Sequence, residues 1–223
     1  TILGLARQNF LYPKGGMASL VQHLHAEAKA ADVRFHLSTS FSPSDTSSDP
    51  VLFSGHLAEL EPSSGLEYRG LYLLHLQVPS DAVGSVDTWY APETEFWFGR
   101  VSQPAQFSTA FKRDKSTVLC VEIPEGNWGQ DQDFIQKIPT IMRQLRQAKI
   151  LNRDADCSLA RQSFLPRIYP MYRRGWLQSW RQAMSSVGES GNIFPFGRQG
   201  LFLHCNMDHA VETAADLVEH IRG

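Results

Sequence analysis

The feature that most constrains the fold is the C-terminal stretch of residues 192–221. It predicts a short strand, a turn at Gly197 and Arg198, a second apolar run, and a helix that Asn206 or Asp208 caps. Apolar residues recur on one face of this helix at spacings of three and four: Met207, Val211, Ala214, Val218 and Ile221. The stretch therefore predicts a strand, a tight turn and an amphipathic helix that close a domain.

The start of such a helix is a candidate ligand site. Its first backbone N–H groups have no partner within the helix, and they lie at the positive end of the helix dipole, so they suit an electron-rich ligand atom. The alternative is an ordinary capped helix, since capped helices are far more common than anion sites. For Arg198 the alternative to ligand binding is a structural ion pair.

This order of segments resembles the end of the FAD-dependent amine oxidase and protoporphyrinogen oxidase superfamily, which includes UDP-galactopyranose mutase relatives. Members close with Gly-Arg and then a short polar motif at a helix start, and that helix lies against the pyrimidine edge of the flavin. The resemblance implies that the matching residues contact FAD: Gly197, Arg198, Asn206, Met207 and Asp208.

Other segments occur in the same order as in that superfamily. Residues 12–37 resemble its Pro-x-Gly-Gly-Met segment, which adds Gly15, Gly16 and Met17 to the cofactor-binding candidates. Residues 164–175 resemble the Ala-Tyr-Pro-x-Tyr segment that precedes the closing motif. Residues 66–78, 87–108 and 118–138 resemble strands and a helix of its substrate domain.

One hallmark of dinucleotide binding is absent from the sequence. No GxGxxG follows a predicted strand, opens a helix and has an acidic residue at the usual distance. The chain also begins at Thr1 and enters the superfamily pattern partway through. We therefore expect the C-terminal portion of a larger flavoprotein. The N-terminal FAD half would lie in cis or on a separate chain, and loss of the cofactor is the alternative.

The resemblance implies an α+β chain, which would be α/β in the complete parent. Residues 1–66 and 181–223 would form a partial, discontinuous FAD-binding domain, and residues 67–180 an inserted substrate domain with an antiparallel or mixed sheet. The helices predicted from periodicity are 17–31, 130–149 and 175–187, with a kink or break at Pro139. The predicted strands are 33–37, 51–55, 68–78, 95–101 and 117–123.

Composition excludes several function classes. A net charge of −2 over 223 residues gives no basic surface for nucleic acid. No apolar run is long enough for a transmembrane segment. The three cysteines form no zinc or redox pattern, which favours a reducing, cytoplasmic location. The eight histidines form no metal-binding motif, so no metal is expected.

The candidates for contact with a small-molecule substrate are Arg100, Tyr169 and Tyr172. Arg100 follows Phe96 and Phe98 on one face of a predicted strand, and an Arg among aromatic residues suits a carboxylate or phosphate. The alternatives are an Arg that extends from a sheet edge to solvent and tyrosines that belong to the core. His204 is expected to be a hydrogen-bonded structural residue.

Three functions remain open at this stage. The first is the substrate-binding and flavin-capping portion of an FAD-dependent oxidoreductase, inactive as this chain alone. The second is a flavin-dependent UDP-sugar mutase, in which Arg100, Arg167, Arg173, Tyr169 and Tyr172 would surround a diphosphate. The third is a non-catalytic binding module. If no partner chain supplies the missing N-terminal half, a partly uncovered face of the FAD domain predicts poor solubility or self-association.

Overall fold

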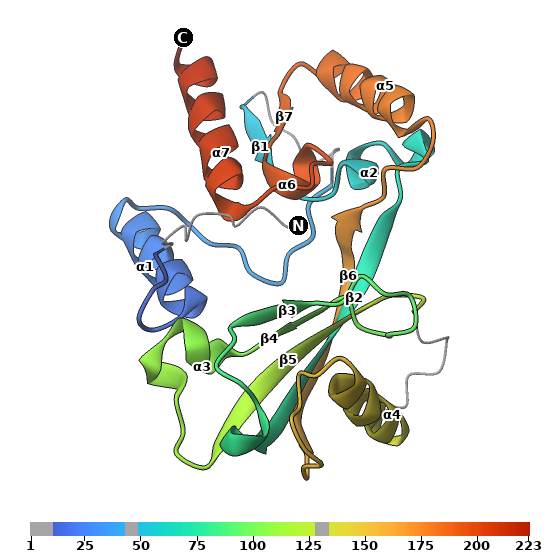
Figure 1. Cartoon of the computed structure of the whole chain (residues 1–223). Coiled ribbons are helices and arrows are strands. Elements are labelled where there is room, and N and C mark those ends of the chain that lie inside the picture. The colour runs from blue at the N-terminus through green and yellow to red at the C-terminus, as the bar shows by residue number, and fades with distance from the viewer. Residues whose placement is uncertain (1–10, 43–48, 128–133) are drawn as a thin grey trace, which may run out of the picture. The chain divides into compact units, whose positions relative to one another are not determined.

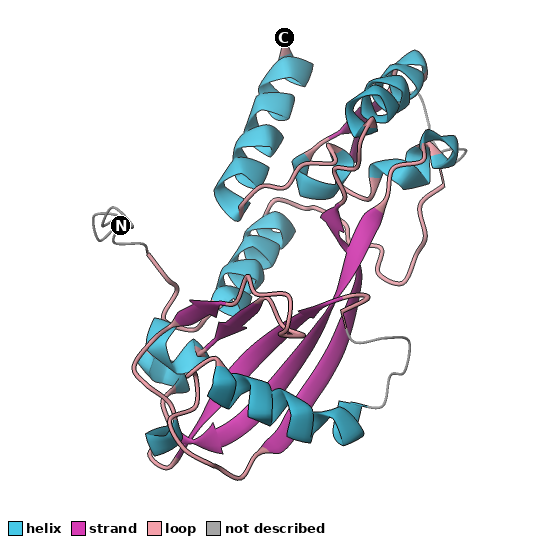
Figure 2. Ribbon diagram, turned by 45° about the vertical axis from the view of Figure 1, so that its right-hand side comes forward, coloured by secondary structure: helices cyan, strands magenta, loops and turns pink. Residues whose placement is uncertain are grey.

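The computed structural model describes residues 11–42, 49–127 and 134–223 (Figures 1 and 2). It is an α+β fold, as predicted from the resemblance. The chain divides into two compact units. Unit 1 comprises Thr1–Leu37 and Tyr72–Ser163, and unit 2 comprises Ser38–Leu71 and Phe164–Gly223. Most of unit 1 is thus inserted into the sequence of unit 2, which is the discontinuous arrangement that we expected.

Unit 1 is built on a five-stranded sheet with the strand order β3-β4-β5-β2-β6. The strands are β2 (Tyr68–Pro79), β3 (Thr88–Tyr90), β4 (Arg100–Ser102), β5 (Ser116–Pro124) and β6 (Ser158–Pro170). β3 pairs antiparallel with β4, and β4 pairs antiparallel with β5. The predicted antiparallel pairing is therefore confirmed for these strands, whose connections are short.

One face of this sheet is a fully buried apolar layer. Alternate residues of β2 and β5, such as Leu74, Leu76 and Leu119, face α4 (Phe134–Gln147), which contributes Ile141 and Leu145 (Figure 2). Alternation with a period of two places the intervening residues on the opposite face. The sheet therefore has one face that forms the core and one face that is free for polar side chains.

Unit 1 also contains further helical elements within its described residues. They are α1 (Met17–Ala30), η3 (Ser80–Ala82), α3 (Pro104–Phe107) and η4 (Thr109–Phe111). Gly16 precedes α1 with φ of 79°, and a Cβ at this position would lie 2.7 Å from Cζ of Phe111. A residue with a side chain would need both a strained backbone and displacement of this ring. Glycine is therefore required here by local packing.

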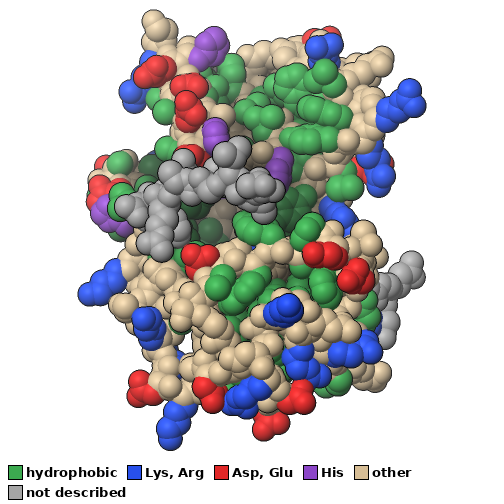
Figure 3. Space-filling model, in the orientation of Figure 1, with side chains coloured by type: hydrophobic (Ala, Val, Ile, Leu, Met, Phe, Trp, Pro, Cys, Tyr) green, Lys and Arg blue, Asp and Glu red, His purple; other side chains and the backbone are tan. Residues whose placement is uncertain are grey.

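Unit 2 is organised around a short parallel ladder. β1 (Val51–Phe53) pairs with β7 (Ile193–Pro195), and the helical elements are α2 (Leu57–Leu60), η2 (Pro62–Ser64), α5 (Trp176–Glu189), α6 (Gly197–Gly200) and α7 (Met207–Arg222). Its buried core contains Phe53, Leu57, Leu66, Ala183, Val187, Ile193 and Phe202. α5 supplies the predicted apolar face to this core, except that Leu177 is 41% exposed. Figure 3 shows hydrophobic side chains at the surface around α5.

Two predicted strands differ from the structure. Residues 33–37 form no strand, and Phe35 instead packs its ring against His25 of α1 at 4.4 Å. Residues 95–99 are turns, and the strand begins at Arg100. There the side-chain amide of Gln144 donates to the Glu95 carbonyl and accepts from the Trp97 N–H, both at 3.1 Å. The side chain of Gln144 replaces the backbone partner that a strand would have needed.

α4 runs through Pro139 as one helix, so the predicted break is not observed. The part of the predicted helix at 130–133 lies outside the described residues. Pro139 removes one backbone hydrogen bond. Burial of Ile141, Met142 and Leu145 against the sheet offsets that loss and keeps the helix continuous.

The boundaries of the compact units differ from the predicted boundaries after residues 66 and 180. The units change at Leu37, Leu71 and Ser163, so the segment with α1 groups with the five-stranded sheet. The boundaries at Leu71 and Ser163 fall inside the strands β2 and β6, so each of these strands belongs partly to both units. A boundary placed between secondary-structure elements cannot describe this division. The assignment of FAD binding and substrate binding to separate domains stays a prediction.

The apolar stripe of α7 is largely exposed, and no residue of this helix is fully buried. Val211 is 67% exposed at its centre. We expect Val211→Glu to reduce self-association, because it places a charge on the stripe that would be buried between copies. Light scattering at increasing protein concentration measures this. Gln178→Glu adds the same charge on α5 and should leave association unchanged; equal effects of both variants would contradict the prediction.

Candidate functional site

The turn at Gly197 and Arg198 is the first turn of α6, which lies between β1 and α7. The Phe196 N–H donates to the Phe53 carbonyl at 2.9 Å, and a Cβ on Gly200 would lie only 2.6 Å from that same oxygen. Gly197 has φ of 68°, and its N–H donates to Oγ1 of Thr213 on α7 at 3.1 Å. Glycine is therefore needed at both ends of α6, once for backbone conformation and once for close approach.

The N-terminus of α7 begins where the sequence predicts. Asn206 occupies the N-cap position with an extended backbone, but no side chain forms a capping hydrogen bond. The Asp208 carboxylate instead lies 3.2 Å from Nδ1 of His209. Within the described residues, the first N–H groups of α7 thus have no intrahelical acceptor and no cap from the Asn206 side chain. This end of the helix is available to an acceptor atom from outside the helix.

Arg198 lies beside this helix start with an incompletely used guanidinium. Its Nη1 donates to the Cys205 carbonyl at 2.7 Å, and its Cζ lies 5.1 Å from the ring centroid of Tyr169. Its Nε and Nη2 are buried and have no hydrogen-bond partner among the residues that the structure describes. Within the described part of the chain no carboxylate forms an ion pair with Arg198, so the structural ion pair that we weighed is not found there. Each unpaired buried donor costs roughly 1–3 kcal/mol, and an electron-rich ligand would remove that cost.

The predicted tyrosines converge on the same turn. The Tyr169 ring contacts both the guanidinium of Arg198 and the ring of His204, whose centroid is 5.5 Å away. The Tyr172 hydroxyl accepts from the His204 N–H at 2.7 Å and donates to the Phe202 carbonyl at 3.3 Å. His204 is exposed and this hydrogen bond involves only its backbone, so it does not bear out the structural role that we expected for its side chain. Tyr169, Tyr172, Arg198 and the start of α7 all belong to unit 2.

Three residues of this site were not predicted. Phe202 is fully buried with φ of 54°. The indole Nε1 of Trp180 donates to the Leu201 carbonyl at 3.0 Å. Nε2 of Gln199 donates to the Ile168 carbonyl at 3.2 Å. A left-handed backbone is uncommon at a phenylalanine. No local sequence signal could have identified Phe202, because tertiary packing alone holds it in that conformation.

The remaining cofactor-binding candidates lie elsewhere in the chain. Gly15, Gly16 and Met17 lie at the start of α1 in unit 1, where Ser108 Oγ donates to the Lys14 carbonyl at 2.7 Å. Gly16 has the packing role described above. Contact of these residues with a cofactor stays a prediction from the resemblance.

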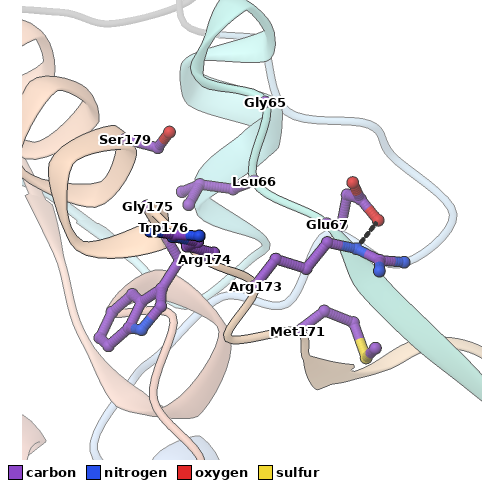
Figure 4. Close-up of a pocket in the computed structure, with 9 residues that line it drawn as sticks. All are labelled: Gly65, Leu66, Glu67, Met171, Arg173, Arg174, Gly175, Trp176 and Ser179. Carbon is purple, nitrogen blue, oxygen red and sulfur yellow. Dashed lines mark hydrogen bonds and ion pairs between the residues drawn. The ribbon is translucent and has the colours of Figure 1, made fainter.

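A cavity of about 240 Å³ lies at the start of α5 (Figure 4). It is lined by Gly65, Leu66, Glu67, Met171, Arg173, Arg174, Gly175, Trp176 and Ser179. Nε of Arg173 donates to the Glu67 carboxylate at 2.6 Å across its rim. Arg167 is similarly paired with Glu59, at 2.7 Å. Two arginines of the hypothetical diphosphate cluster are therefore already neutralised by glutamates.

In unit 1 Arg100 lies on the polar face of the sheet. It stands directly opposite Glu122 in the β4–β5 register, and its Nη2 and Nε lie 2.6 and 2.8 Å from Oε1 of that carboxylate. The side chain of Glu122 is only 10% exposed, whereas that of Arg100 is 43% exposed. β4 is an interior strand, so Arg100 does not extend from a sheet edge. Its side chain is exposed enough for a substrate to contact it while the ion pair with Glu122 is kept.

Two further groups on this sheet have shifted acidities. Burial, and then the charge of Glu122, raise the pKa of the Cys120 thiol to about 11. Burial and the charge of Arg161 lower the pKa of His75, whose Nδ1 has no hydrogen-bond partner within the described ranges. Both groups are therefore uncharged at neutral pH. The described residues contain no group of three or more His, Cys, Asp or Glu side chains that could hold a metal ion.

Comparison with solved structures shows which fold this is. The chain is similar to reduced UDP-galactopyranose mutase, with a TM-score of 0.68 and 15% identity over 78% of this chain. It is also similar to a putative protoporphyrinogen oxidase from Exiguobacterium sp. 255-15, with a TM-score of 0.52 and 13% identity over 77% of this chain. The matches span 41% and 40% of those proteins. The resemblance seen in the sequence is thus confirmed at the level of the fold.

Sequence comparison adds no further assignment. No family model matches the chain, and no curated protein matches it. Among the described residues, no helix is both long and apolar enough to cross a membrane. The conclusion from all comparisons is that the chain has the fold of a portion of these two enzymes.

The buried ion pair on the sheet predicts a stability effect. Glu122→Gln should lower the free energy of unfolding by about 1–3 kcal/mol, because it leaves a guanidinium without its charged partner at a half-buried position. Urea denaturation measures this change. Glu93→Gln is the matched control, because Glu93 is exposed and its side chain forms no hydrogen bond or ion pair with the described residues. A variant at position 122 as stable as the control would show that Arg100 does not depend on Glu122.

The acidity of Cys120 predicts slow alkylation. At pH 8 a thiol with a pKa of about 11 should be a thiolate roughly a hundredfold less often than one with the ordinary value of 9.0, and its alkylation rate should rise about tenfold per pH unit. Mass spectrometry after timed iodoacetamide treatment resolves the site. The same chain in denaturant is the control, and equal rates in both conditions would contradict the prediction.

Proposed function

We propose that this chain is the substrate-binding and flavin-capping portion of an FAD-dependent oxidoreductase. One observation carries the proposal: among the described residues, Arg198 keeps Nε and Nη2 buried and unpaired beside a start of α7 that the Asn206 side chain does not cap. Both groups are donors, and both belong to unit 2. A ligand that suits them presents acceptor atoms, such as the carbonyl oxygens at the pyrimidine edge of a flavin.

The residues present fit that cofactor. The first N–H groups of Met207 and Asp208, at the positive end of α7, would stabilise negative charge on the ring. Arg198 would donate from the nitrogens that have no protein partner, while its bond to the Cys205 carbonyl keeps the guanidinium in place. Tyr169 would shield the outer face of the guanidinium from water. When bound, the flavin would supply the redox chemistry by accepting a hydride from a C–H bond of the substrate, as the adjoining C–N or C–C bond is oxidised to a double bond.

The polar face of the sheet is our candidate for substrate contact. Arg100 remains partly exposed while paired with Glu122, so its outer N–H groups could bind a carboxylate or phosphate. Cys120 is protonated in this environment, so the proposal gives it no nucleophilic role. The reaction and the substrate belong to the complete protein, of which we propose that this chain is a part.

The mutase alternative requires cationic groups for a UDP diphosphate. Arg167 and Arg173 could serve only by exchanging their glutamate partners for phosphate, and both ion pairs are exposed, so the exchange would cost about 1 kcal/mol or less for each pair. A rise in melting temperature with UDP would favour the mutase. Peroxide production from an amine would favour the oxidase.

The flavin site predicts a specific effect of Arg198→Gln. This variant should bind FAD roughly 10- to 100-fold more weakly, because a charge-assisted hydrogen bond contributes about 1.5–3 kcal/mol. Titration followed by flavin fluorescence and visible absorbance measures the affinity. Arg222→Gln removes the same charge at the far end of α7 and should bind FAD as the unaltered chain does.

Two results would overturn the proposal. One is a folded chain that neither carries FAD nor binds added FAD or riboflavin, which would indicate a non-catalytic module. The other is equal loss of affinity in the variants at Arg198 and Arg222, which would indicate a general charge effect. Purification of the chain with bound flavin, together with selective loss in Arg198→Gln, would support it.

A further inference from the structure

We infer that Tyr172 is a positioning residue whose hydroxyl holds the α6–α7 loop, and with it the start of α7 and the guanidinium of Arg198. Its link to flavin binding rests on the proposed function. The inference assigns Tyr172 a role different from the substrate contact suggested by the sequence. It concerns residues 201–206, which connect α6 to α7 within unit 2.

The hydroxyl of Tyr172 spans this loop by acting as acceptor and donor at once. It accepts from the His204 N–H at 2.7 Å and donates to the Phe202 carbonyl at 3.3 Å. A phenolic oxygen can make both bonds, whereas a phenylalanine ring can make neither. Both hydrogen bonds of the hydroxyl are made to the backbone of the loop. The tyrosine ring meanwhile packs 4.4 Å from the ring of Trp176 and 5.8 Å from that of Phe202.

The loop needs such a holder because Phe202 has a left-handed backbone. Its φ of 54° is unfavourable for a residue with a Cβ, and its side chain is nevertheless fully buried. Burial fixes where the ring lies but does not by itself fix the direction of the chain that follows. The two hydrogen bonds of Tyr172 fix that direction, because they bind the backbone on both sides of Leu203.

The other loop contacts come from the neighbouring elements. Trp180 of α5 donates to the Leu201 carbonyl at 3.0 Å, the Leu203 N–H donates to the Arg198 carbonyl at 2.9 Å, and Nη1 of Arg198 donates to the Cys205 carbonyl at 2.7 Å. The position of the Arg198 side chain is thus coupled to the same loop. Release of His204 and Phe202 from Tyr172 would loosen the loop next to the Cys205 carbonyl that holds this guanidinium.

The experiment compares the full chain with Tyr172→Phe, which keeps the aromatic packing and removes only the hydroxyl. The control is Tyr90→Phe, at a tyrosine that is 73% exposed on β3. Hydrogen–deuterium exchange without ligand should show about tenfold faster exchange at residues 202–206 in Tyr172→Phe, since one net hydrogen bond corresponds to about that factor. Exchange in β2 and β5 should remain unchanged.

A second measurement tests the link to the ligand. FAD titration at a temperature at which all variants are folded should show affinity about fivefold to tenfold lower in Tyr172→Phe, together with a changed visible spectrum of the bound flavin. A hydroxyl that contributed only to stability would lower the melting temperature and leave the spectrum of bound flavin unchanged. Both readouts should be unaffected in Tyr90→Phe.

The outcomes separate the inference from the proposed function. Unchanged exchange at residues 202–206 in Tyr172→Phe would overturn the inference, whether or not FAD binds. Faster exchange with unaltered FAD affinity and spectrum would show that the loop does not position the ligand-binding groups, which also overturns it. Faster exchange in a chain that binds no FAD would support the loop-holding role and defeat the proposed function alone.

Discussion

The parallel pairing of β1 with β7 is the constraint on which unit 2 depends. Val51 stands opposite Ile193, and Phe53 stands opposite Pro195, so segments far apart in the sequence form one ladder. Parallel strands require a long connection between them, and here that connection contains most of unit 1. The ladder also presents the Phe53 carbonyl, which accepts from the Phe196 N–H and lies close against Gly200. The place of α6 follows directly from this contact.

From α6 onward, hydrogen bonds to the backbone hold each segment of unit 2 in place against the next. Gly197 is tied to Thr213 of α7, and the loop between the two helices is tied to Tyr172, Trp180 and Arg198. A site built this way has little freedom to adapt, because its polar groups are already committed to the backbone. Among the described residues of this site, the exceptions are two guanidinium nitrogens of Arg198, Oε1 of Gln199 and the first N–H groups of α7. Most donors of the site are already hydrogen-bonded within the protein, and the few that are not would suit a ligand that presents acceptor atoms.

The sheet of unit 1 separates apolar and polar side chains onto its two faces. Its α4 face is closed by apolar residues such as Leu76 and Val121, so the polar groups of the sheet gather on the other face. There Glu122 neutralises Arg100, and burial keeps Cys120 protonated. On this face the Arg100–Glu122 ion pair and a protonated thiol can meet a ligand without the high desolvation cost of an isolated buried charge.

The sequence by itself determined the long helices, the strands β1, β2 and β5, and the closing order of Gly197, Arg198 and the start of α7. Periodicity, glycine placement and the resemblance carry that information locally. The tertiary structure alone decided that Gln144 would replace a strand partner at residues 95–97, that Glu122 would pair with Arg100, and that Phe202 would adopt a left-handed backbone. These outcomes depend on contacts between residues distant in sequence, whose energies no local pattern contains.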